Sequence, residues 1–311
     1  MIDRVIGRRG ALALLAAGLL GGCRAAPAEA GRGLVTLDGG TARLALLLRR
    51  EQAGTVAVTG GDPVLPAIAA VQGAPVLDLG GAGGLDLEAL ARLRPEVLAG
   101  HRLPGVPAEL LRGLARLRLV RRTGDVRADA LALGAAVGAA GAAVAAWEAF
   151  ERDRAELAAR LAARRMPTIS VLGAGRGDGV VTTVSGSTAA GQVLRALGVA
   201  RPAAQEAVAD GPLPFPEISG ERLGEHDADL LVLLRGNAGS VREQPLLRTS
   251  PAVRAGRVVE ADQFEWAALA SLPSARWVLA DLAGLLLERS APLLGIGSPG
   301  GLDRLRGFRA G

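Results

Sequence analysis

The chain has 311 residues, enough for about two ordinary domains, and carries a formal net charge of +5. Half of the residues are hydrophobic and 22% are charged, so a folded body with sizeable cores is expected. Its arginines are interspersed with acids and not interleaved with aromatic residues, which argues against a nucleic-acid-binding surface. The single cysteine, Cys23, excludes an intrachain disulfide and a multi-cysteine metal site.

Residues 1–23 have the pattern of an export signal. A basic start is followed by an apolar run at 11–20, and small residues precede Cys23. The run is too short for an ordinary membrane-spanning helix and is typical of a secretory signal. The sequence LGGC at 20–23 resembles a bacterial lipobox, which implies that Cys23 is lipidated and anchors the protein to a membrane.

The arginine pair at 8–9 leaves a twin-arginine export route open beside the general secretory route. Residues 24–33 are small and polar without any period, so they predict a flexible tether between the anchor and the folded body. We therefore expect an exported lipoprotein of the cell envelope.

From residue 34 to residue 127, short β-type runs alternate with helical segments. This alternation predicts a three-layer α/β unit with a mostly parallel sheet, the N-terminal lobe. The predicted strands are 34–37, 55–58, 76–77, 96–99 and 117–120, and the predicted helices are 41–50, 64–71, 87–93 and 107–115.

An alanine-rich helical connector is predicted at 128–165. Its second part, 140–165, carries charges at helical spacing, and as a helix it would span about 39 Å, enough to run along two lobes. A second α/β unit follows at 166–288, and residues 289–311 are predicted to form a loose tail. The expected fold is α/β, with two three-layer lobes joined by one long helix and a ligand cleft between the lobes.

The second unit is built from predicted elements of both kinds. Its predicted strands are 168–172, 180–184, 230–234 and 258–260, and its predicted helices are 189–197, one that starts at 220, and 274–287.

Three local patterns occur in order around the predicted long helix. They are LDLEAL at 85–90 with LRPEVL at 93–98, ISGERL at 218–223 with DADL at 227–230, and SPAVRAGRV at 250–258. Together they resemble the periplasmic binding proteins of iron-siderophore, haem and vitamin B12 importers, over about residues 33–288. The resemblance implies a ligand-delivery protein that works with an ABC permease and its ATPase, as a monomer, without enzymatic activity or a permanently bound cofactor.

Three arginines follow predicted strands, where ligands bind in open α/β sheets: Arg102, Arg176 and Arg235. Guanidinium groups suit an anionic chelate because they are planar, always charged and rich in donors. By position the three resemble the arginine triad of catecholate-siderophore binders, so an anionic Fe(III)-siderophore is the favoured ligand. His101 and the aromatic face of Trp266 are expected to reach the same ligand. Since the chain has no tyrosine, direct coordination of the metal by the protein is not expected.

The resemblance also implies a role for two glutamates, Glu88 and Glu221. Each would dock one lobe onto the permease. Cobalamin or haem remains an alternative ligand. An exported envelope protein without a transport role remains an alternative function on the same scaffold. A catalytic triad would need His101 or His226, and nothing in the sequence places a serine beside either, so an enzyme is not expected.

Overall fold

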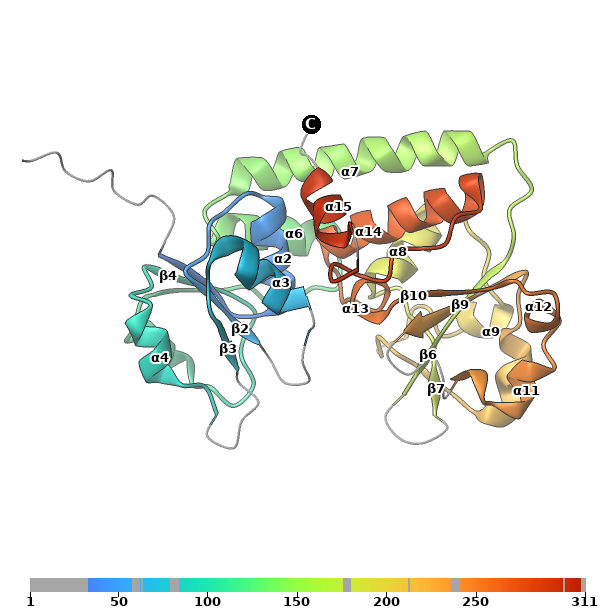
Figure 1. Cartoon of the computed structure of the whole chain (residues 1–311), viewed down its shortest axis with the longest axis horizontal. Helices are drawn as coiled ribbons and strands as arrows, with labels where there is room; N and C mark the ends of the chain where they lie inside the picture. Colours follow the sequence, from blue (N-terminus) through green and yellow to red (C-terminus); the bar gives the residue numbers. More distant parts are fainter. Residues whose placement is uncertain are drawn as a thin grey trace, which may run out of the picture.

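The structure, a computed structural model, describes residues 33–57, 62, 64–78, 84–175, 180–211, 213–235, 241–298 and 300–308. Two α/β lobes lie side by side, and a long helix runs over both of them (Figure 1). The predicted fold class is confirmed. The predicted export signal, Cys23, almost all of the predicted tether and Arg176 lie outside the described residues.

The first lobe is built on a five-stranded sheet in which all strands are parallel, in the order β3-β2-β1-β4-β5. Its three central strands are short apolar runs with fully buried side chains, such as Val35, Val56 and Leu98, whereas its two edge strands have no buried residue. The strands are β1 (Leu34–Thr36), β2 (Gly54–Ala57), β3 (Val76–Asp78), β4 (Val97–Gly100) and β5 (Arg116–Leu119). The helices are α2 (Gly39–Leu47), α3 (Val64–Gln72), α4 (Leu87–Arg92) and α5 (Ala108–Arg112).

The second lobe has a mixed sheet in the order β10-β9-β6-β7-β8. The strands β6 (Ile169–Ala174), β9 (Leu230–Arg235) and β10 (Val258–Asp262) are parallel, whereas β7 (Val181–Thr182) and β8 (Glu217–Ile218) add antiparallel pairs. The predicted strand at 180–184 therefore shrinks to two residues. The helical elements are α8 (Ala189–Ala196), α9 (Ala203–Glu206), the 3-10 helix η1 (Gly220–His226), α11 (Pro245–Arg248), α12 (Pro251–Arg254) and α13 (Gln263–Trp266).

Two helices connect the lobes, α6 (Val126–Ala136) and α7 (Ala140–Leu161). The long helix α7 has 22 residues, hence about 33 Å, and ends four residues before the predicted position. The chain has to leave the helix ahead of Pro167, because proline disfavours helical geometry in the residue before it. No helix within the described ranges combines the length and the hydrophobicity that a membrane span requires.

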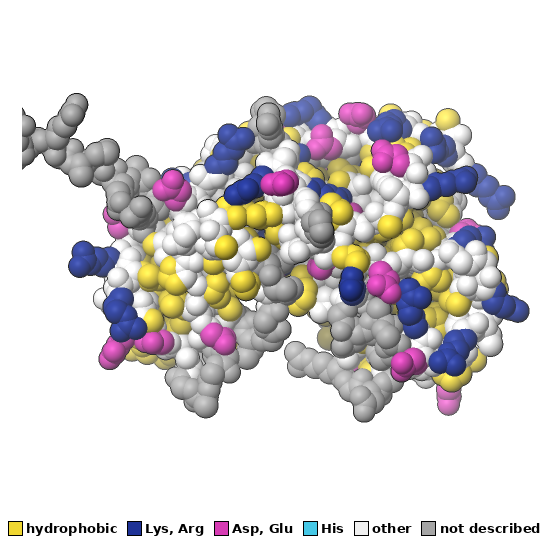
Figure 2. All heavy atoms as spheres, viewed as in Figure 1, with side chains coloured by type: hydrophobic (Ala, Val, Ile, Leu, Met, Phe, Trp, Pro, Cys, Tyr) yellow, Lys and Arg dark blue, Asp and Glu magenta, His cyan; other side chains and the backbone are white. Residues whose placement is uncertain are grey.

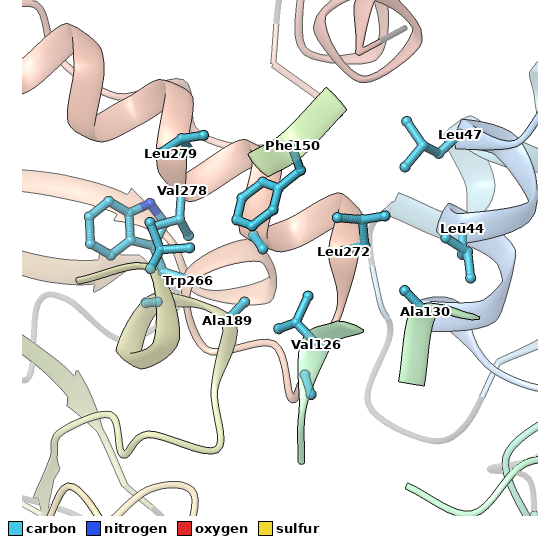
Figure 3. Packing of buried hydrophobic residues seen from close by; sticks show 14 of the residues in the cluster. Leu44, Leu47, Val126, Ala130, Phe150, Ala189, Trp266, Leu272, Val278 and Leu279 are labelled. Carbon is cyan, nitrogen blue, oxygen red and sulfur yellow. The ribbon is translucent and has the colours of Figure 1, made fainter. Parts of the chain in front are cut away.

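A further helix, α14 (Leu272–Ala283), lies between the lobes and contacts α2, α6, α7 and α8. Ten of its residues are buried, so it is a core element rather than a surface helix. In Figure 3, Leu272 lies between Leu44 of the first lobe and Trp266 of the second. One hydrophobic cluster thus runs without a break from one lobe to the other.

The loose tail predicted at 289–311 is wrong for the residues that the structure describes. Helix α15 (Gly301–Gly307) packs beside the first lobe, and Leu305 and Ile296 are buried with Leu65 and Ile68 of α3. The Arg304 guanidinium donates to Asp281 Oδ1 (2.7 Å) in α14 and lies over the Trp277 ring. A few apolar side chains at wide spacing are enough to fix this segment, which its Gly- and Pro-rich composition obscures.

Candidate ligand cleft

A cavity of about 750 Å³ lies where the carboxyl ends of strands from the two sheets face each other. The first lobe contributes α2 and His101, which follows β4, and the second lobe contributes the ends of β6 and β9. Residues 267–273, which lead into α14, and two residues of α6 complete the lining. Figure 2 shows the surface indented between the two lobes. Ligands bind at such strand ends in open α/β sheets, and the volume is in the range of ordinary small-molecule sites.

Most of the lining is apolar. Aliphatic and aromatic side chains come from both lobes and from α6, among them Leu44, Leu133, Phe215, Phe264 and Leu272. Leu213, at the rim, leaves 60% of its surface exposed, which is unusual for a large aliphatic side chain. An apolar rim and wall of this kind would be covered by a ligand that presents hydrophobic surface.

His101 is held in place at the cavity wall by a short chain of contacts. Asp38 caps α2 through Thr41 N (2.9 Å), and its other oxygen accepts a hydrogen bond from His101 N (2.9 Å). Gly100 has φ 150° and lies so close to Asp38 that a Cβ would be 2.8 Å from Oδ2, so glycine is required there. The His101 ring is buried, and its Nδ1 lies 3.0 Å from the Val120 carbonyl oxygen.

Arg122 lines the cavity from a short segment that is fixed at several points. Thr123 N and Oγ1 donate to Asp129 Oδ1 (2.8 and 2.7 Å) at the start of α6. Gln192 of α8, in the second lobe, donates through Nε2 to the Gly124 carbonyl (2.6 Å). The backbone beside Arg122 is therefore pinned between the two lobes, while its side chain remains exposed.

Arg43 of α2 also lines the cavity, but it is engaged in a buried ion-pair cluster. Its Nη2 donates to Asp62 Oδ1 (3.0 Å), and its Nε lies 3.3 Å from Glu265 Oε1 without hydrogen-bond alignment. Glu265 belongs to α13 of the second lobe, so this pair links the lobes. Burial raises the pKa of Glu265, although the nearby Arg43 and the hydrogen bond from Ser274 oppose this rise. Burial likewise raises the pKa of the neighbouring Asp262.

The second lobe contributes one carboxylate to the lining, Glu217 of β8. Its side chain is exposed, whereas the next residue, Ile218, is buried in the core of the second lobe. Among the described residues, the ionisable side chains that line the cavity are Arg43, His101, Arg122 and Glu217.

The structure brings His101 to the cavity and places the other described residues of the predicted ligand set elsewhere. Arg102 is exposed in the loop after β4, and Arg235 is exposed at the end of β9; neither lines the cavity. The predicted ligand contact of Trp266 is wrong, because this side chain is 0% exposed and its Nε1 donates to Asp281 Oδ2 (2.8 Å). It packs behind the cavity wall in the shared core.

Sequence reasoning missed Arg122, Arg43 and Glu217. Arg122 follows β5 within three residues. Position after a strand, the criterion that selected Arg102 and Arg235, therefore applied equally to Arg122 and gave no reason to prefer it. Arg43 lies on a helix expected to be structural. Nothing in the sequence showed that β8, only two residues long, would carry Glu217 to the cavity.

The two glutamates predicted to dock onto a permease lie one on each lobe. Glu88 is in the first turn of α4, with its side chain 92% exposed. Glu221 is exposed in η1, which packs against α11. Figure 1 shows α4 and α11 on the two different lobes.

Residues 34–264 match the periplasmic binding protein family. The chain belongs to this family. Membership assigns it a solute-binding role outside the cytoplasm, and the family relationship predicted from the three sequence patterns is confirmed. No curated protein sequence matches the chain.

Solved structures of other proteins share the fold at low sequence identity. SirA of Staphylococcus aureus complexed with staphyloferrin B has a TM-score of 0.64 and 17% identity, covering 82% of this chain and 92% of that one. FhuD2 of the same organism with bound ferrioxamine B has a TM-score of 0.66 and 15% identity, covering 82% and 98%. PiuA of Streptococcus pneumoniae, an iron uptake ABC transporter substrate-binding protein, has a TM-score of 0.60 and 18% identity, covering 80% and 91%.

Proposed function

We propose that this periplasmic binding protein captures a ferric siderophore and delivers it to an ABC importer. The observation that carries the proposal is the cavity of about 750 Å³ between two α/β lobes that α7 joins. Structurally similar proteins with bound staphyloferrin B and ferrioxamine B support the choice of ligand. Haem, which His101 could ligate from the cavity wall, and cobalamin are the alternative ligands.

Capture starts in the open cleft, where the ligand displaces water from the apolar wall. A small approach of the lobes then completes the enclosure and strengthens the remaining polar contacts, because less water screens them. The motion has to be small because α14 contacts elements of both lobes and the buried Arg43–Glu265 pair links α2 to α13. A wide hinge rotation would break a continuous hydrophobic core.

Delivery would use Glu88 and Glu221, which lie exposed on different lobes. Complementary basic pockets on a permease would hold both lobes at once and could pry them apart. The double variant Glu88→Ala, Glu221→Ala should keep its affinity for the ligand but lose uptake in cells. Unchanged uptake by this variant would remove the docking role.

Anchoring would use Cys23, which ends the predicted export signal. A lipid on this residue would hold the folded body at the membrane through the tether at 24–33, and the protein would act as a monomer. The variant Cys23→Ala should move from the membrane fraction to the soluble fraction of the envelope. Membrane retention of Cys23→Ala would contradict lipid anchoring.

The ligand assignment is tested by equilibrium dialysis of the purified protein against a ferric hydroxamate, a ferric catecholate, haem and cyanocobalamin. Saturable binding of at least one ferric siderophore at one site per chain supports the proposal. Binding of haem or cobalamin alone would keep the transport role and change the ligand. No binding of any of the four would favour an envelope role outside transport.

A further inference from the structure

We propose that the cleft selects a ferric chelate of low net charge, and that Arg122 and Glu217 set this selectivity as a balanced pair. The inference rests on the proposed function and narrows its ligand class. It replaces the anionic catecholate that the arginine pattern in the sequence favoured. It follows from the ionisable side chains that line the cavity in the described part of the chain.

The first charge, Arg43, is already neutralised by the protein. Its guanidinium has Asp62 Oδ1 at 3.0 Å and Glu265 Oε1 at 3.3 Å, and the Arg43 and Glu265 side chains are almost completely buried. A buried pair that loses one partner leaves an uncompensated charge, which is strongly unfavourable. Arg43 is therefore committed to holding the lobes together and is not a free cation for an anionic ligand.

The second and third charges oppose each other. Arg122 comes from the segment between β5 and α6, and Glu217 comes from β8 in the other lobe; both are exposed and both line the cavity. Any ligand between them meets one positive and one negative group. The pair orients a ligand that has both donors and acceptors, but it gives no net attraction to an anion.

His101 presents one ring nitrogen to the protein and leaves the other for a ligand. Its Nδ1 lies 3.0 Å from the Val120 carbonyl, so the neutral ring places its proton on Nδ1 and donates it to that oxygen. This tautomer leaves Nε2 with a lone pair. The described part of the cavity wall therefore offers donors from Arg122 and acceptors from Glu217 and His101, as amide and hydroxamate groups require.

Once Arg43 is paired, the described lining carries no surplus of positive charge, and the apolar wall makes this decisive for a charged ligand. Fe(III) held by three catecholates carries three negative charges, whereas Fe(III) held by three hydroxamates carries none. Moving a multiply charged anion out of water into a wall of leucine and phenylalanine is strongly unfavourable unless paired cations receive it. A neutral chelate avoids this penalty and gains from burying its hydrophobic surface.

The test measures the affinities of N-acetylated ferrioxamine B, a neutral hydroxamate, and of a ferric tris-catecholate by equilibrium dialysis at physiological salt. Wild-type protein should bind the neutral chelate at least about tenfold more tightly. Glu217→Gln should shift the affinity ratio toward the tris-catecholate by about fivefold, and Arg122→Gln should shift it the other way. Arg102→Gln and Arg235→Gln are matched controls for Arg122→Gln, because each removes one arginine charge that does not line the cavity. Both should leave the ratio of the two affinities unchanged.

Each outcome decides between the two proposals. Equal or tighter binding of the tris-catecholate overturns the charge selectivity but leaves siderophore capture standing. A ratio that responds to Arg102→Gln or Arg235→Gln and not to Glu217→Gln also overturns it. Binding of neither chelate removes siderophore capture itself, and the inference falls with it.

Discussion

Replacing Trp266 with phenylalanine separates a core residue from a ligand contact. In the structure, Trp266 is completely buried, and its Nε1 donates to the carboxylate of Asp281 at 2.8 Å. Phenylalanine keeps an aromatic ring in the shared core but removes this donor. Asp281 then retains the hydrogen bond from Arg304 Nη1 at 2.7 Å.

The expected loss of unfolding free energy has two parts. A hydrogen bond to a charged group contributes about 1.5–3 kcal/mol, and the smaller ring leaves a cavity worth about 1 kcal/mol. The sum is about 2.5–4 kcal/mol. At about 2 °C per kcal/mol for a chain of this size, Tm should fall by roughly 5–8 °C.

Denaturant unfolding followed by circular dichroism measures the stability, and equilibrium dialysis measures the ligand affinity of the same preparation. Trp266→Phe should lose stability while its affinity for the bound chelate stays within about twofold of wild type. An unchanged unfolding free energy together with a tenfold weaker affinity would refute the core assignment and return Trp266 to the ligand site.

Three further variants test other features. Since burial raises the pKa of Glu265, its contribution to stability is complete below the ordinary carboxyl value of about 4.3 and is lost as the pH rises through the raised pKa. In Glu265→Gln, Tm should therefore fall less steeply with rising pH above about pH 4.3 than it does in the wild type. An equally steep fall in both proteins would contradict this role of Glu265. Leu305→Ala should cost about 2–4 kcal/mol in urea unfolding, against little change for the exposed Arg306→Ala on the same helix; equal effects would count against a docked tail. Gly100→Ala should cost about 1–3 kcal/mol, because a Cβ there meets Asp38, and a neutral result in thermal unfolding would show that the contact relaxes.

The sequence was most informative where the hydrophobic period is strong. The β-rich runs of the first lobe and the charged, proline-free stretch of α7 correspond to the observed elements within a few residues. Short elements such as α9, α13 and β8 were not predicted, because four residues or fewer carry no readable period. Their formation depends on the packing of the surrounding lobe.

The site was harder to predict than the fold, for a physical reason. Position after a strand selects a sheet edge, but it does not say which side chains face the cavity. Arg102, Arg122 and Arg235 satisfy that rule equally, and only the folded lobes show that Arg122 lines the cleft. The order of the C-terminal tail was missed for a related reason, since several residues of the cluster that buries Leu305, such as Leu65 and Ile68, lie more than 200 positions earlier.

The docked position of α15 bears on the order in which the chain can fold. Ile296 and Leu305 cover Leu65 and Ile68, so the first lobe lacks part of its core until residues near 300 have been synthesised. N-terminal domains usually fold as they emerge from the ribosome, and contacts between distant residues form late. Such a delay would suit a polypeptide that crosses a membrane before folding, because the first lobe reaches its full stability only after the C-terminal segment has been made.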